Sequence, residues 1–369
     1  MAELRENARH LRRERELDGL RGIAATMVLL FHCLSAVAAT AEVQSWLLTS
    51  WPAAIANGGS AVVLFFVLSG YVLSGSFARD TSAMGAAGFL TRRVLRLYPA
   101  YLLALAAACL AAMLTSRLDH GLGESAWARA HAEQQLGLGQ ILRSALVPGE
   151  AYGMIPVGWT LRLELVYSLL FPLLAWFARR FDAGVIVIVI AAAATLFVTP
   201  DRLANYAMPF SVGMAMHAYR DRLALDEWSP ALRAAVLVLA IAAFALPPTH
   251  LWPLSRFAGM GLATAASATL MLLAALSPLR SALRSRPLAA LGEASYSLYL
   301  LHVPVVLLAA PVMLGDAPAI ETHSAVLRWL ALAAVVMPVT WAIAALSYRY
   351  VERPAMDAGR AWSRRTSRA

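Results

Sequence analysis

Residues 17–22 read LDGLRG and lead into the apolar run IAATMVLLF of residues 23–31, which His32 interrupts. Arg21 and His32 are eleven residues apart. At 3.6 residues per turn this is about three turns, so the two side chains share one helix face, roughly 16 Å apart along the axis. If Arg21 marks the membrane edge, His32 lies near the middle of a hydrocarbon core about 30 Å thick. A titratable group at that depth indicates either a functional site or a histidine hydrogen-bonded inside a helix bundle.

The composition of the chain is that of a membrane protein. Of its 369 residues, 60% are hydrophobic and only 14% are charged, whereas a soluble protein carries about 25% charged residues. Because only helices or closed barrels satisfy their backbone in lipid, and the apolar runs have the length of helices, we expect an all-α polytopic membrane protein.

Apolar runs between charged loops predict about ten transmembrane helices, with both termini cytoplasmic. The predicted spans are residues 20–40, 59–77, 98–115, 157–178, 183–199, 204–219, 230–247, 257–277, 293–314 and 325–347. We expect a cytoplasmic segment 1–18, a membrane domain 19–348 and a basic cytoplasmic tail 349–369. Residues 1–41 imitate a cleaved signal peptide, but their long apolar run and the further spans indicate a retained first helix.

The charged residues support this orientation. The net charge is +9, and of 31 basic residues, all arginine, 24 fall on the proposed cytoplasmic side, six fall outside and Arg162 lies within a span. This asymmetry is the positive-inside pattern, so we expect no nucleic-acid partner. Cys33 and Cys109 lie in apolar runs and are interpreted as small hydrophobic residues. No cluster has metal-ligand spacing, so we expect no metal.

Two further ionisable side chains are predicted at depth. Glu164 is about seven residues into its span from the outer side, or roughly 10 Å deep, and His302 is about nine residues from the inner side, or roughly 14 Å. Together with His32 they converge on the middle of the bilayer, which favours a functional site. A proton-coupled transporter is one alternative, but the chain shows neither the internal repeats nor the matched broken spans typical of transporters.

Other polar groups have weaker signals. Arg92, Arg93 and Arg96 occupy about one helical turn at the inner surface, where they can bind lipid headgroups or the phosphates of a soluble cofactor. Four further histidines are expected in solvated outer loops, namely His120, His131, His250 and His323.

Six motifs in order resemble membrane acyltransferase family 3, whose members O-acylate extracytoplasmic sugars and some small molecules. They are LDGLRG at 17–22 with the Arg21-to-His32 spacing, FFVLSGY at 65–71, RRVLRLYP at 92–99, WTLRLE at 159–164, LGEASYSLYLLH at 291–302 and YVERP at 350–354. The chain departs from the family pattern at Thr160, where serine is usual. It departs also at Val63-Leu64, where an acidic residue often precedes the Phe-Phe pair, and at Tyr167-Ser168, where an aromatic pair is usual.

The resemblance implies an acyl-CoA donor, acetyl-CoA in the first instance, on the cytoplasmic side of a bacterial inner membrane. It implies a hydroxyl acceptor on a polysaccharide or lipid-linked sugar outside. A succinyl donor or a small-molecule acceptor such as a macrolide is the runner-up. On this reading Arg21, Arg92, Arg93 and Arg96 hold the CoA phosphates.

Acyl transfer needs a base for the attacking hydroxyl, and a histidine with its ordinary pKa near 6.5 suits that role. His32 is the candidate, as general base or as transient acyl carrier. Glu164 is expected to orient His32 or to approach the acceptor, and His302 is a second catalytic candidate.

Overall fold

The computed structural model describes residues 2–77, 83–132, 137–148, 155–181, 184–198, 201–222, 227–246, 256–276, 279–318 and 320–366. His250, one of the predicted loop histidines, lies outside these ranges. The chain forms two compact units. The first comprises Met1–Ala24, Gly59–Phe89 and Tyr167–Glu293, and the second comprises Ala25–Gly58, Leu90–Val166 and Ala294–Ala369.

The described chain is helical, with turns and one isolated antiparallel bridge between Val37 and Glu124. Six helical segments are long and apolar enough to cross a membrane: Arg15–Ala36, Trp51–Phe77, Gly85–Thr115, Gly158–Arg180, Ser295–Leu314 and Thr322–Ser363. Three shorter apolar helices cover Gly184–Val198, Pro230–Ala245 and Ala258–Ala274. The prediction of an all-α membrane protein is therefore confirmed, while the count of ten spans and the orientation of the termini stay predictions.

The first unit takes its helices from three parts of the chain. It contains α9 (Gly184–Val198), α10 (Arg202–Tyr219), the 3-10 turn η1 (Arg220–Arg222), α11 (Pro230–Ala245), α13 (Arg256–Ala274), α14 (Leu279–Leu283) and α15 (Arg286–Glu293). It shares α1 (Ala2–Ala36), α4 (Gly58–Phe77), α5 (Ala83–Thr115) and α8 (Gly158–Arg180) with the second unit. A Cβ at Gly70 of α4 would lie 1.9 Å from the carbonyl oxygen of Phe210 in α10, so this contact requires glycine. Small residues allow such close approach between helices in lipid.

The second unit contains the remaining helices. These are α2 (Ala41–Thr49), α3 (Trp51–Ile55), α6 (Ala126–Ala132), α7 (Leu138–Leu146), α16 (Ser295–Leu314), α17 (Thr322–Ser347), the π-helical turn η3 (Tyr348–Glu352) and α18 (Arg353–Thr366). Trp329 of α17 is buried and its indole N–H donates to the carbonyl oxygen of Leu30 at 3.0 Å, which ties α17 to α1.

Helix α5 differs from the prediction, which began its span at residue 98 after a cytoplasmic connection. The helix runs without interruption from Ala83 through Pro99 to Thr115. Its apolar segment Gly85–Thr115 has 31 residues, whereas about 20 cross a hydrocarbon core. Proline removes only one helical hydrogen bond, and neighbouring helices let a membrane helix tolerate it. Arg92, Arg93 and Arg96 therefore lie on a continuous helix.

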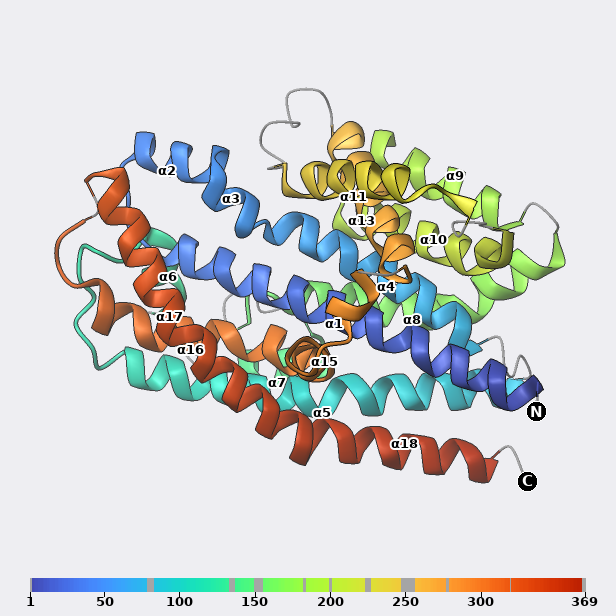
Figure 1. Ribbon diagram of the computed structural model, residues 1–369. Coiled ribbons are helices and arrows are strands. Elements are labelled where there is room, and N and C mark those ends of the chain that lie inside the picture. The colour runs from blue at the N-terminus through green and yellow to red at the C-terminus, as the bar shows by residue number, and fades with distance from the viewer. Residues whose placement is uncertain are drawn as a thin grey trace. The chain divides into compact units, whose positions relative to one another are not determined.

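The predicted tail is also helical up to Thr366. Helix α17 continues through η3 into α18, and Figure 1 draws this stretch as one continuous helical ribbon that ends in red. A Cβ at Gly359 of α18 would lie 3.4 Å from Cα of Arg92, so α18 packs on the first half of α5. This packing explains why a polar sequence stays ordered: α18 has an apolar face for α5 to cover.

The segment between the predicted spans 98–115 and 157–178 contains the helices α6 and α7. The hydroxyl of Tyr101 donates to the carbonyl oxygen of Ser144 at 2.6 Å, and that of Tyr98 to Leu146 at 2.8 Å. Tyr98 lies seventeen residues before Thr115 on α5, or roughly 25 Å along the axis. The segment that follows α5 therefore folds back, and its helix α7 packs beside α5 near Tyr98 and Tyr101.

Candidate functional site

Two histidines from distant parts of the chain meet inside the second unit. The Nε2 atom of His302 in α16 lies 3.1 Å from Nδ1 of His32 in α1, and their ring centroids are 4.9 Å apart. His302 is fully buried, whereas His32 is half-buried. The structure thus brings together two of the three predicted catalytic side chains.

The hydrogen bonds assign the tautomer of each neutral ring. Nδ1 of His32 lies 2.9 Å from the carbonyl oxygen of Val28, and Nδ1 of His302 lies 3.3 Å from that of Leu298. A carbonyl oxygen only accepts, so each Nδ1 carries the hydrogen. Nε2 of His302 is then unprotonated and accepts from Nδ1–H of His32, which Val28 and His302 share.

The same assignment leaves Nε2 of His32 unprotonated, with its lone pair available. Among the residues that the structure describes, no polar group is hydrogen-bonded to this atom. A half-buried imidazole with an available Nε2 and an oriented Nδ1–H can take a proton from a hydroxyl or attack a carbonyl carbon. These are the two roles predicted for His32.

Helix α16 has three polar side chains at successive turns, and the last of them is His302. The hydroxyl of Tyr296 donates to the carbonyl oxygen of Leu97 at 2.9 Å. One turn further, the Thr160 hydroxyl donates to that of Tyr299 at 2.9 Å. The next turn places His302 against His32. These side chains span roughly 9 Å along the helix axis, from residue 296 to residue 302. Their hydrogen bonds hold α16 against α5, α8 and α1.

Glu164 forms an ion pair with Arg93. Its carboxylate accepts a hydrogen bond from the guanidinium of Arg93, and the exposed fractions of the two side chains are 24% and 11%. This ion pair joins α8 to α5, and the catalytic role expected of Glu164 stays a prediction. This pairing of a predicted catalytic acid with a predicted phosphate ligand was not foreseen, because the two residues are 71 positions apart.

The other predicted phosphate ligands have separate surroundings. Arg92 donates to the hydroxyl of Ser363 in α18, and Arg96 is half-buried on the same helix. Arg21 belongs to the first unit, where it forms an ion pair with Asp18 at 2.9 Å. Arg21 and His32 share the continuous helix α1, as predicted from their spacing.

Sequence reasoning missed two aromatic residues on α6. The indole ring of Trp127 lies 5.5 Å from the ring of His32, and the ring of His131 lies 4.8 Å from that of Trp127. The prediction that His131 is a solvated loop histidine is wrong, because it is half-buried in this stack. His323, by contrast, is exposed as expected. An aromatic residue followed four positions later by histidine was the available signal.

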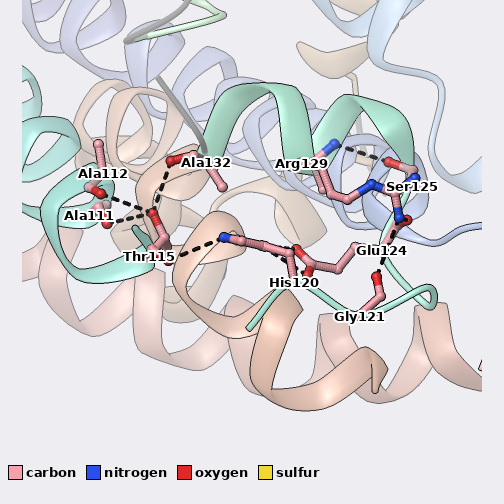
Figure 2. Close-up of polar contacts among 10 residues, drawn as sticks. Ala111, Ala112, Thr115, His120, Gly121, Glu124, Ser125, Arg129 and Ala132 are labelled. Carbon is pink, nitrogen blue, oxygen red and sulfur yellow. Dashed lines mark hydrogen bonds and ion pairs between the residues drawn. The ribbon is translucent and has the colours of Figure 1, made fainter. Parts of the chain in front are cut away.

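His120 also departs from the solvated state that was expected. Its Nδ1 lies 3.0 Å from the carboxylate of Glu124, and its Nε2 lies 3.2 Å from the carbonyl oxygen of Thr115. Figure 2 shows His120 between these two groups. Glu124 is fully buried, and its carboxylate is paired with His120.

The loop around His120 holds α6 in place. Arg129 donates to the carbonyl oxygen of Glu124 at 2.9 Å (Figure 2). The Ser125 hydroxyl donates to Ser35 at 2.6 Å and accepts from the Ala128 amide at 3.1 Å. A Cβ at Gly123 would lie 2.2 Å from the carbonyl oxygen of Leu314, so only glycine fits against the end of α16. The helix α6 is therefore anchored at its first turn.

These features define a class: an integral membrane protein whose helices enclose a histidine pair suited to proton transfer. The family model described as an acyltransferase domain, that of acyltransferase family 3, matches residues 14–345. The chain belongs to this family and is a membrane acyltransferase. No curated protein and no solved structure matches the chain.

Proposed function

We propose that the protein transfers an acyl group, acetyl in the first instance, from cytoplasmic acyl-CoA to a hydroxyl of an extracytoplasmic polysaccharide or lipid-linked sugar. The observation that carries this proposal is the available Nε2 of His32, whose Nδ1–H is directed at Val28 and His302. The proposed setting is a bacterial inner membrane, with about ten spans and both termini cytoplasmic.

In the proposed reaction His32 acts as general base. Its Nε2 takes the proton of the acceptor hydroxyl while the hydroxyl oxygen attacks the thioester carbonyl carbon. The carbon–sulfur bond then breaks, and the CoA thiolate leaves with the proton that the imidazolium returns. The products are an ester and free CoA. A general base of this kind contributes about 10²–10⁴-fold to the rate.

His302 has a positioning role in this reaction. When Nε2 of His32 takes a proton, the ring becomes positively charged and its Nδ1–H becomes a stronger donor. The unprotonated Nε2 of His302 accepts from that N–H at 3.1 Å and holds the imidazole in one orientation. In a hydrolase triad, a carboxylate orients the catalytic histidine and stabilises its charged form. The uncharged ring of His302 orients His32 in the same way but stabilises the positive charge less.

The donor side is proposed to be the arginines. Arg21 is about 16 Å from His32 along α1, which suits a thioester carried at the end of a long arm. Arg93 forms its ion pair with Glu164, so a CoA phosphate would have to replace that carboxylate. Arginine favours such oxyanions because its planar fork donates two parallel hydrogen bonds.

Labelled acyl-CoA tests the function directly. Membranes containing the protein are incubated with labelled acetyl-, propionyl- or succinyl-CoA, and label is followed into glycan and lipid-linked sugar. We expect CoA release and base-labile ester in the sugar fraction, absent from membranes without the protein. No CoA release with any donor, together with proton-coupled solute uptake, would overturn the proposal in favour of a transporter.

A further inference from the structure

We propose that Trp127 and His131 of α6 form the subsite that binds the acceptor, and that its ligand is a neutral, hydroxyl-bearing ring such as a pyranose. This inference rests on the proposed function, because the subsite is identified by its position beside His32. Nothing in the family match assigns a role to either residue.

The first observation is a continuous row of rings. From the fully buried end the order is His302, His32, Trp127 and His131, with centroid separations of 4.9, 5.5 and 4.8 Å. Trp127 and His131 are four residues apart on α6, so they project from one helix face. This face of α6 therefore lies beside the imidazole ring of His32.

The second observation is the polar chemistry of these two rings. Nδ1 of His131 donates to the carbonyl oxygen of Trp127 at 2.7 Å, which leaves its Nε2 as an acceptor. Within the described part of the chain, neither this Nε2 nor the indole N–H of Trp127 has a hydrogen-bond partner, and both side chains are half-buried. The buried Trp329 differs, because its N–H donates to Leu30 at 3.0 Å. A buried indole usually finds a partner.

The third observation is the charge of the face. Arg129 is the one charged residue of α6, and its guanidinium donates to the carbonyl oxygens of Glu124 and Gly121. Apart from Arg129, Trp127 and His131, the residues of α6 are alanines. A donor, an acceptor and an aromatic face without a net charge match a neutral ring whose C–H groups stack on the indole and whose hydroxyls both donate and accept.

The fourth observation is rigidity. The first turn of α6 is capped by Ser125, which is bonded to Ser35 and Ala36 of α1. At the other end, the carbonyl oxygen of Ala132 lies 3.3 Å from the Thr115 hydroxyl (Figure 2). A recognition surface works best when its side chains are held by such supporting contacts. The subsite is thus fixed relative to His32 through α1 itself.

The test compares Trp127→Leu, Trp127→Phe and His131→Leu with the unsubstituted protein in lipid nanodiscs. The control is Trp46→Leu, which removes an exposed tryptophan of the same unit, on α2. The acceptor probes are the methyl pyranosides of glucose, galactose, mannose and N-acetylglucosamine, with glycerol as a hydroxyl compound that has no ring. Thermal unfolding in the nanodiscs verifies that each variant is folded.

We expect the unsubstituted protein to acylate at least one pyranoside in preference to glycerol. Trp127→Leu should raise the KM for that pyranoside tenfold or more and leave the KM for acetyl-CoA within twofold, with smaller increases for Trp127→Phe and His131→Leu. An unchanged pyranoside KM in Trp127→Leu would overturn the subsite. CoA release without acylation of any pyranoside would overturn the ring ligand alone, whereas no CoA release at all would overturn the proposed function instead.

Discussion

His32 and His302, which are 270 residues apart in the sequence, share one hydrogen bond of 3.1 Å between Nδ1 and Nε2. The backbone carbonyls of Val28 and Leu298 determine which nitrogen of each ring carries the hydrogen. The pair therefore has a direction: His302 accepts, His32 donates, and the remaining Nε2 of His32 is available to the substrate.

The direction of this bond predicts a difference between two substitutions of His302. His302→Leu removes the acceptor, and we expect kcat to fall roughly 10- to 100-fold, as when a residue that orients a functional histidine is lost. His302→Gln places an amide oxygen near the position of Nε2 and should recover most of that loss. Steady-state kinetics with labelled acetyl-CoA measure both. Equal kcat values in the two variants would show that a hydrogen-bond acceptor at residue 302 does not contribute to the rate.

The roles of base and acyl carrier predict different fates of the label. If His32 is a general base, protein that is denatured at neutral pH during turnover should carry no acyl label. Separation of the protein under denaturing conditions, followed by counting, measures this. Label that stays on the protein and disappears in His32→Gln would assign the carrier role instead.

The ion pair between Arg93 and Glu164 predicts coupled effects on stability. Arg93→Met and Glu164→Gln should each lower the free energy of unfolding by roughly 1.5–3 kcal/mol, the range for hydrogen bonds to charged groups. The double variant should lose less than the sum of the two, since both remove one interaction. Unfolding of purified protein by a denaturing detergent gives the three values.

The same two variants separate a structural role from phosphate binding. If Arg93 also holds CoA, Arg93→Met should raise the KM for acetyl-CoA more than Glu164→Gln does. Equal KM values in both variants would leave Arg93 with the ion pair and remove it from the donor site.

Arg21 is expected to act on the donor and not on the chemistry. Arg21→Ala should raise the KM for acetyl-CoA at least fivefold with kcat largely kept, because a lost phosphate contact weakens binding. Asp18→Asn tests whether loss of the ion pair alone has that effect, and Arg143→Ala, an exposed arginine of α7, controls for charge. An unchanged KM in Arg21→Ala would contradict the assignment.

The loop that carries α6 depends on a buried carboxylate. Glu124→Gln keeps the shape of the side chain but weakens its hydrogen bond with His120, because an amide oxygen is a weaker acceptor than a carboxylate. We expect faster amide hydrogen exchange across residues 120–132 and little change elsewhere. Glu321→Gln, at an exposed position, is the matched control. Unchanged exchange in the loop would indicate that the backbone contacts alone hold α6.

The sequence was sufficient to predict the all-α class but not the ends of the helices. Apolar runs predicted all-α structure, yet the continuation of α5 through Pro99 and of α17 into α18 depends on packing between residues far apart, such as Gly359 and Arg92. Hydropathy describes one segment at a time and carries no information on such partners. The helices α6 and α7 were missed because polar residues surround them.

For the candidate site, depth arguments placed His32 and His302 at similar levels but did not indicate that they touch. The partner of Glu164 was missed for a physical reason. Residues at one level on different helices meet only if their faces coincide, and helix rotation is set by packing rather than by hydropathy. Thr160, a departure from the family pattern, donates to Tyr299 through its hydroxyl, which a serine at this position would also carry.

The central claim is that Nε2 of His32 takes the proton of the acceptor hydroxyl. It is tested most directly by acetyl transfer from labelled acetyl-CoA in nanodiscs containing either the unsubstituted protein or His32→Gln, each normalised to folded protein. We predict at least about a 100-fold loss of kcat, with the KM for acetyl-CoA within twofold. Retention of more than about one tenth of the activity by folded His32→Gln would contradict it.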